Sequence, residues 1–179
     1  MSRPKNTKKL PQREPDTLEA VIVRAIFPPG FPVEIGYQIY QLRHLRQLRD
    51  ALNDGSITRS DLVIYTGGIE SDRITASEAI GEELAAQERD FHLRSLGSVL
   101  AGHSDFFETL ARGVAAIAAF PKAKLAVADA WRFLVHYCGI TPKPAQVAEH
   151  ANKLSPELIT ASRARDYMRS MGMLPVGGN

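Results

Sequence analysis

Hydrophobic residues recur at spacings of three and four along most of this chain, which predicts a mainly helical protein. The clearest case follows the proline-rich break at 28–32, where apolar residues line one face of the segment 33–54. Gly55 comes next, and glycine at this place favours the left-handed conformation that ends a helix. A second periodic segment begins with Thr75 and Glu78, which have the spacing of a capping box.

Two further helices are predicted in the second half of the chain. The segment 104–120 is nearly all apolar and rich in small residues, so we expect it to be the central helix of the core. Pro121 stands at the tolerated first position of the next helix, which Gly139 ends. The residues expected to point inward from this helix are Leu125, Ala128, Trp131, Leu134, Val135 and Cys138.

Two segments, 16–27 and 60–72, fit a helix and a strand equally well. Asp16 is a suitable N-cap, but β-branched residues follow it, and the later segment contains the short apolar run 62–66. If 20–26 and 62–66 are both strands, they pair into a minor sheet that needs helices packed against it. The predicted fold is therefore a mainly α bundle of about six helices, with a possible two-stranded element and a C-terminal helix-turn-helix-like hairpin.

Charge and proline content divide the chain into four parts. Residues 1–15 carry five cations and three prolines with few apolar groups, which predicts a flexible basic arm. Residues 16–140 are predicted to form the helical core domain. The hairpin at 141–174 packs on that core, and 175–179 form a tail.

The C-terminal hairpin carries most of the functional interpretation. Pro144 and the pair Ser155–Pro156 predict the starts of two helices, and Gly172 predicts the end of the second. Arginine and hydroxyl side chains, which suit phosphates and base edges, gather outside the hydrophobic row of this second helix. The candidate nucleic-acid contacts are Ser155, Thr160, Ser162, Arg163, Arg165, Tyr167 and Arg169.

These residues give the hairpin a family resemblance that covers about 30 positions. "VAEHA" (147–151), "LSPELITASRAR" and "MGML" resemble the helix-turn-helix of small bacterial transcriptional regulators. The resemblance implies a bacterial DNA-binding regulator that inserts the second helix into the major groove of double-stranded DNA and acts as a homodimer. Asn152 stands where that family usually has glycine, and the turn is one residue longer. The alternative is that these helices are only the last pair of the bundle.

A second basic feature is "RHLRQLRD" (43–50), which places Arg43, Arg46 and Arg49 on or near one outer line of a helix. Such a stripe is typical of phosphate contacts, and it is equally typical of a solvated face that pairs with acids on a neighbouring helix. The other candidate function is a helical adaptor or inhibitor that binds another protein through this stripe or through 104–120.

Composition narrows the class of protein further. The chain of 179 residues is 44% hydrophobic and 23% charged, with a net charge of +2, which is ordinary for a globular protein. One cysteine excludes an intramolecular disulfide and a cysteine-cluster zinc site. No apolar run is long enough to span a membrane, and the basic N-terminus has no apolar segment behind it. We therefore expect a cytoplasmic protein without a membrane partner.

No motif in the chain predicts catalysis. The glycines in the 65–73 loop lack the lysine and the length of a phosphate-binding loop. Glu88 and His92 have the spacing of half a metal site, but no second pair complements them. We expect neither enzymatic activity, nor a cofactor, nor a bound metal.

Overall fold

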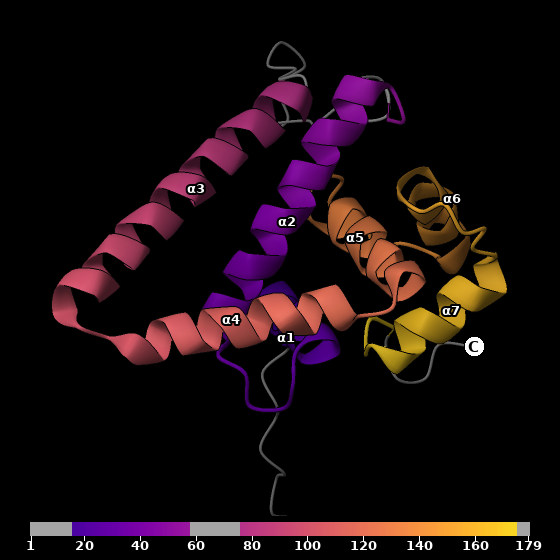
Figure 1. Cartoon of the computed structure of the whole chain (residues 1–179). Helices are drawn as coiled ribbons and strands as arrows, with labels where there is room; N and C mark the ends of the chain where they lie inside the picture. Colours follow the sequence, from indigo (N-terminus) through magenta and orange to yellow (C-terminus); the bar gives the residue numbers. More distant parts are fainter. Residues whose placement is uncertain (1–15, 58–75, 175–179) are drawn as a thin grey trace, which may run out of the picture.

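The computed structural model of this chain describes residues 16–57 and 76–174, and within them it contains seven helices and no strand (Figure 1). The prediction of a mainly helical bundle is confirmed for these residues. The helices are α1 (Leu18–Ile26), α2 (Val33–Asp54), α3 (Ala76–Ala101), α4 (Ser104–Ala119), α5 (Lys122–His136), α6 (Pro144–Leu154) and α7 (Ala161–Ser170).

α2 organises the N-terminal part of the fold. It packs against α1, α3 and α4, while α5 packs mainly against α6 and α7 (Figure 1). One side of α2 is buried, and it carries apolar side chains such as Leu45 and Leu48. Gly55 ends the helix with φ of 80°, as its position in the sequence predicts. Helices α5–α7 therefore make a three-helix C-terminal unit beside the α1–α4 part.

The segment 20–26 is helical, so the strand that its β-branched residues allowed is not formed. Thr17 caps α1, because its hydroxyl accepts a hydrogen bond from Ala20 N at 3.2 Å, and Asp16 forms an ion pair with Arg24 instead. Tertiary packing outweighs β propensity here, since Ile22, Val23 and Ile26 share the buried face of one helix. The segment 62–66 and Thr75 lie outside the described residues.

The expectation that 104–120 forms the centre of the core was wrong. α4 lies across one end of the molecule, and Gly113 is its only buried residue (Figure 1). A Cβ at Gly113 would meet Ile39 and Phe31, so the glycine allows α4 to approach α2 closely. The small residues therefore serve one close helix contact at the edge of the core.

The end of α5 also differs from the prediction. The helix stops at His136, and Gly139 adopts φ of 63° two residues after the cap at Tyr137. Cys138 consequently lies outside the helix and is exposed rather than part of the inward row.

The second helix of the hairpin begins later than predicted. Ser155 ends α6 and does not start the next helix, and α7 begins after Thr160, whose hydroxyl accepts a hydrogen bond from Arg163 N at 3.2 Å. The side chain of Asn152 explains why α7 begins further along the chain. Its side-chain oxygen accepts from Ile159 N at 2.7 Å and its side-chain nitrogen donates to Ile159 O at 3.0 Å, which holds the linking residues out of helical conformation.

Candidate functional site

The outer face of α7 gathers three of the predicted arginines. Ala164 and Met168 point into the core, which leaves Arg163, Arg165 and Arg169 exposed. Because residues three and four apart share a face, the burial of Ala164 and Met168 fixes the orientation of the whole helix. The arrangement presents a short cationic surface on the second helix of the α6–α7 pair.

Local contacts hold some of these side chains. Arg163 Nε donates to the Tyr167 hydroxyl at 2.8 Å, and Arg163 lies 3.5 Å from a Glu157 carboxylate oxygen. Arg169 lies 3.9 Å from Asp166 on the same helix. Exposed pairs of this kind are worth at most about 1 kcal/mol, so a stronger anion can displace them.

The hydroxyl residues take different positions. Thr160 and Ser162 lie at the N-terminal end of α7, where unpaired backbone N–H groups favour an anion. Ser155 lies at the end of α6, where its hydroxyl accepts from Glu157 N at 3.1 Å and it lines a small cavity together with Arg43. Ser155 is therefore not part of the α7 surface. Tyr167 is half-buried, and the Lys124 ammonium lies 5.8 Å from its ring centroid.

The arginines of 43–49 have separate surroundings. Arg43 pairs with the buried carboxylate of Asp129, Arg46 Nη2 lies 2.9 Å from Glu88 on α3, and Arg49 Nη2 lies 3.0 Å from Asp50. Arg43 and Arg46 line a groove that contains no residue of α7. Along the described chain, the two arginine groups predicted for DNA are therefore not brought into one pocket.

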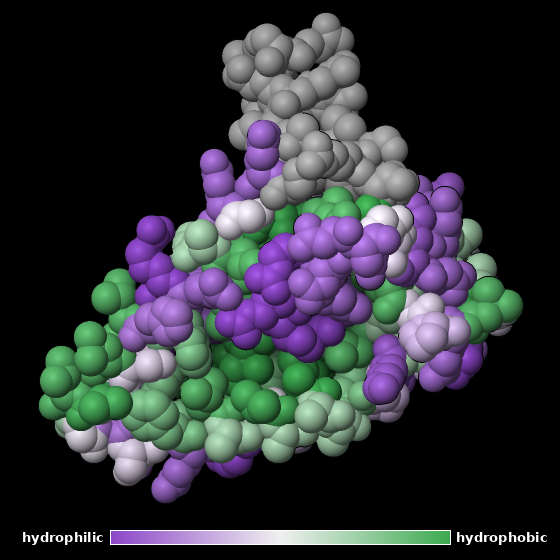
Figure 2. Space-filling view, turned by 45° about the horizontal axis from the view of Figure 1, so that its top comes forward, coloured by the Kyte–Doolittle hydropathy of each residue, from purple (hydrophilic) through white to green (hydrophobic). Residues whose placement is uncertain are grey.

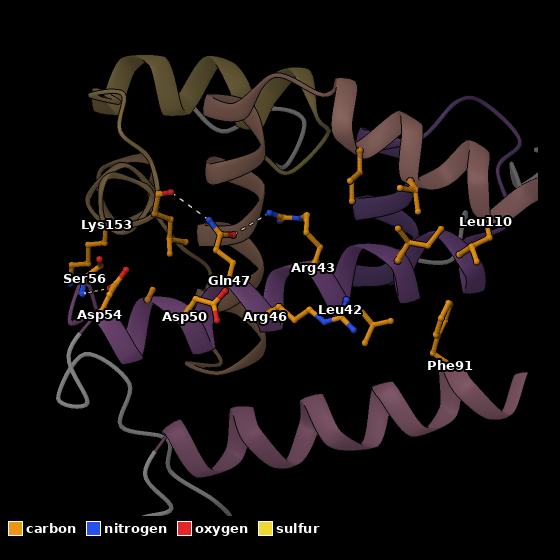
Figure 3. Close-up of a pocket in the computed structure, with 15 residues that line it drawn as sticks. Leu42, Arg43, Arg46, Gln47, Asp50, Asp54, Ser56, Phe91, Leu110 and Lys153 are labelled. Carbon is orange, nitrogen blue, oxygen red and sulfur yellow. Dashed lines mark hydrogen bonds between the residues drawn. The ribbon is translucent and has the colours of Figure 1, made fainter. Parts of the chain in front are cut away.

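That groove has a volume of about 640 Å³ and lies between α2, α3, α4 and the end of α6 (Figure 3). One end is apolar, and the other carries charged and polar groups from α2 and Lys153 (Figure 3). Figure 2 shows a hollow with hydrophobic residues on its floor and hydrophilic residues along its rim. The size and lining suit a small molecule with an apolar body and a polar end. The apolar lining residues are Ile39, Leu42, Ala51, Phe91, Leu110, Val114, Ile117 and Leu154.

A buried polar cluster joins α2, α3 and α5 and was not predicted from the sequence. Arg132 is fully buried, and it donates to Glu83 at 2.9 Å, to the Tyr37 hydroxyl at 3.2 Å and to the Tyr137 hydroxyl at 3.3 Å. Gln41 also donates to Glu83 at 2.6 Å, and the Tyr137 hydroxyl donates to the same carboxylate. Burial favours the neutral form of Glu83, but these donors and the charge of Arg132 outweigh it and lower the pKa of Glu83.

A second buried group lies one helical turn further along α2. His44 and Asp129 are almost completely buried, and His44 Nδ1 lies 3.4 Å from Asp129 Oδ1. Burial lowers the pKa of His44 to about 3, so the imidazole is neutral in the folded protein at neutral pH. A signal was present in the sequence: Gln38, Gln41 and His44 are three apart on a helix that is otherwise apolar on its buried side.

Comparisons with protein-family models, with curated proteins and with solved structures found no match to this chain. None of the helices in the described ranges is both long and apolar enough to cross a membrane. Within 16–57 and 76–174, no three His, Cys, Asp or Glu side chains are grouped so that they could hold a metal ion. The function therefore has to be inferred from the geometry of the chain itself.

Proposed function

We propose that this protein is a DNA-binding transcriptional regulator that contacts double-stranded DNA through α7. The observation that carries the proposal is the outer face of α7, where Arg163, Arg165 and Arg169 are exposed and hydroxyl groups lie at the N-terminal end. Arginine is the side chain that most often contacts guanine edges, and it also pairs with phosphates. Met168 and Ala164 fix the helix on α5 and α6, so the arginines project from a rigid support.

Asp166 lies among these arginines and repels a phosphate backbone. Glu157 is a second acid close to Arg163, but the three arginines and Lys124 of α5, which lies near Tyr167, outnumber the two carboxylates. The local charge therefore favours an anion, with an attraction that falls as salt screens it.

The test uses binding of a labelled duplex, measured by fluorescence anisotropy over a series of salt concentrations. We expect binding at low salt. The logarithm of the association constant should fall linearly with the logarithm of the salt concentration. The double variant Arg165→Ala with Arg169→Ala should lower affinity about tenfold or more at low salt. It should also reduce the salt slope by about two, because each of the two arginines neutralises one phosphate.

A matched control removes the same charge elsewhere. Arg24 and Arg112 are exposed on α1 and α4, so Arg24→Ala with Arg112→Ala should leave binding close to that of the unsubstituted protein. An equal decrease in duplex affinity in both double variants would show only a general effect of net charge. Absence of salt-dependent binding at low ionic strength would rule the function out.

A second candidate function is a helical adaptor that binds another protein. The specific observation in its favour is that Phe107 and Val114, two turns apart on α4, are exposed, and that Val114 lines the groove. This function predicts a protein partner that stays bound after nuclease treatment. The partner should no longer bind the double variant Phe107→Ser with Val114→Ser. The DNA-binding function predicts no effect of that variant on duplex affinity.

A further inference from the structure

The outward face of α3 carries an unusual group of exposed leucines. Leu93, Leu96 and Leu100 are 62%, 56% and 79% exposed, while Leu84 and Ile80 on the same helix are buried. At 100° per residue the three leucines point away from the face that packs on α2. Figure 2 shows the hydrophobic residues that gather where α3 meets α4.

These leucines belong to a regular row. Ala86, Arg89, Leu93, Leu96 and Leu100 are separated alternately by three and four residues, which is the spacing of the contact positions in a coiled coil. A row of this spacing forms a narrow straight stripe along a helix, and it is suited to a second helix lying beside it. Nothing in the described part of the chain covers the leucines.

The remaining parts of the chain are poor candidates to cover this row. Residues 1–15 contain only Met1 and Leu10 as large apolar groups. The segment 58–75 joins the end of α2 to the start of α3. To reach Leu100 and return, it would need about 70 Å, more than its full extended length of about 65 Å, so it cannot cover the whole row. A helix of another molecule can cover all three leucines.

A second copy of this chain fits the row when the two α3 helices run antiparallel. Leu93, Leu96 and Leu100 all lie in the C-terminal half of α3, so a two-fold axis near Leu96 sets the leucines of both copies against each other. The same axis brings Arg89 of each copy toward the α3–α4 corner of the other, where Asp105 is exposed. Arg89 makes no ion pair with any described residue of its own chain, and this contact would give it one.

We propose that the leucine row of α3, formed by Leu93, Leu96 and Leu100, is a homodimer interface in which two copies pair antiparallel. The pairing does not depend on DNA binding, and it leaves α7 outside the interface. It also gives a DNA-binding helix the two-fold partner that recognition of two half-sites requires.

The first test is the mass of the full chain in solution, measured by sedimentation equilibrium across the micromolar range. We expect a dimer for the unsubstituted protein and a monomer for Leu96→Glu with Leu100→Glu, with unchanged helical content by circular dichroism. Leu158 provides the matched control, because it is 78% exposed but lies between α6 and α7. Leu158→Glu should leave the dimer intact.

A second measurement keeps the proposal testable if the charged variant fails to fold. In a Cys138→Ser background, Leu96→Cys lies next to the two-fold axis and should give a disulfide-linked dimer on mild oxidation. Glu82→Cys, far from the axis, should remain monomeric in an antiparallel pair. A monomer at all concentrations, equal loss of dimer in the Leu158 control, or cross-linking at Glu82 alone would overturn the proposal.

Discussion

At the residue scale, the least expected feature is a buried histidine that stays neutral. His44 stacks on Tyr40 with ring centroids 5.8 Å apart, and it lies near Asp129, which pairs with Arg43. The loss of water on burial, and then the nearby arginine charges, oppose a positive charge on the imidazole. The folded protein therefore binds a proton at His44 only under strongly acidic conditions.

This burial predicts a dependence of stability on pH. An unfolded histidine titrates near pH 6.5, whereas the pKa of His44 in the fold is about 3. Between these values the unfolded state binds more protons, so the free energy of unfolding falls as pH decreases, by at most about 1.4 kcal/mol per pH unit. Urea denaturation from pH 7 to 4 should show a smaller fall in His44→Gln, while parallel curves for both proteins would contradict this account.

At the element scale, the start of α7 is set by side chains and not by the proline that precedes it. Ser155–Pro156 has the composition of a helix start, yet Asn152 binds both backbone groups of Ile159, and Ile159 is buried. The chain gains those hydrogen bonds and the burial of one large side chain by remaining non-helical up to Thr160. The α7 surface is positioned by this connection.

Asn152 and Ser155 therefore differ in their contributions to stability. Asn152→Ala leaves the backbone groups of Ile159 without their partners, which should cost about 1–3 kcal/mol of unfolding free energy. Ser155→Ala removes one exposed hydrogen bond, so its effect should stay within about 0.5 kcal/mol. Thermal and urea unfolding measure both variants. A larger loss of stability for Ser155→Ala than for Asn152→Ala would indicate that Ser155 sets the start of the helix.

At the scale of the whole molecule, the Arg132 cluster ties three helices together. Arg132 of α5 binds Tyr37 of α2 and Glu83 of α3, and these contacts hold the first half of α3 against the bundle. The second half of α3 carries the exposed leucine row and meets α4 at Gly102, whose φ is 68°. Tight anchoring at one end of α3 and an uncovered apolar face at the other suit an element that makes contact with a second molecule.

Breaking this cluster on one side should be costly. Glu83→Leu leaves the buried charge of Arg132 without its carboxylate, so we expect stability to fall by about 3–5 kcal/mol. The double variant Glu83→Leu with Arg132→Met removes both charges and should recover much of that stability. Urea denaturation followed by circular dichroism measures the difference. Equal stabilities for the single and double variants would show that the ion pair contributes nothing beyond packing.

The sequence by itself determined the helical class, the extent of α2 and its end at Gly55, and the apolar face of α5 up to Leu134. These features follow from interactions between residues three and four apart, which a linear pattern contains. Arg163 and Arg169 are exposed residues of the last helix, as the sequence predicts, because Met168 and Ala164 mark its buried face. The function assigned to that face remains a prediction.

Only the tertiary structure decided which of several locally acceptable choices the chain takes. It made 20–26 a helix, moved α4 to the edge of the core and delayed α7 past Ser155. It also paired the half-buried Arg43 with the buried Asp129, 86 residues away in sequence, and enclosed Arg132 among groups from three helices. Periodicity indicates that a helix has an apolar side, but the partner of each polar side chain depends on contacts between distant segments. Burial of an ion pair is therefore a property of the folded arrangement.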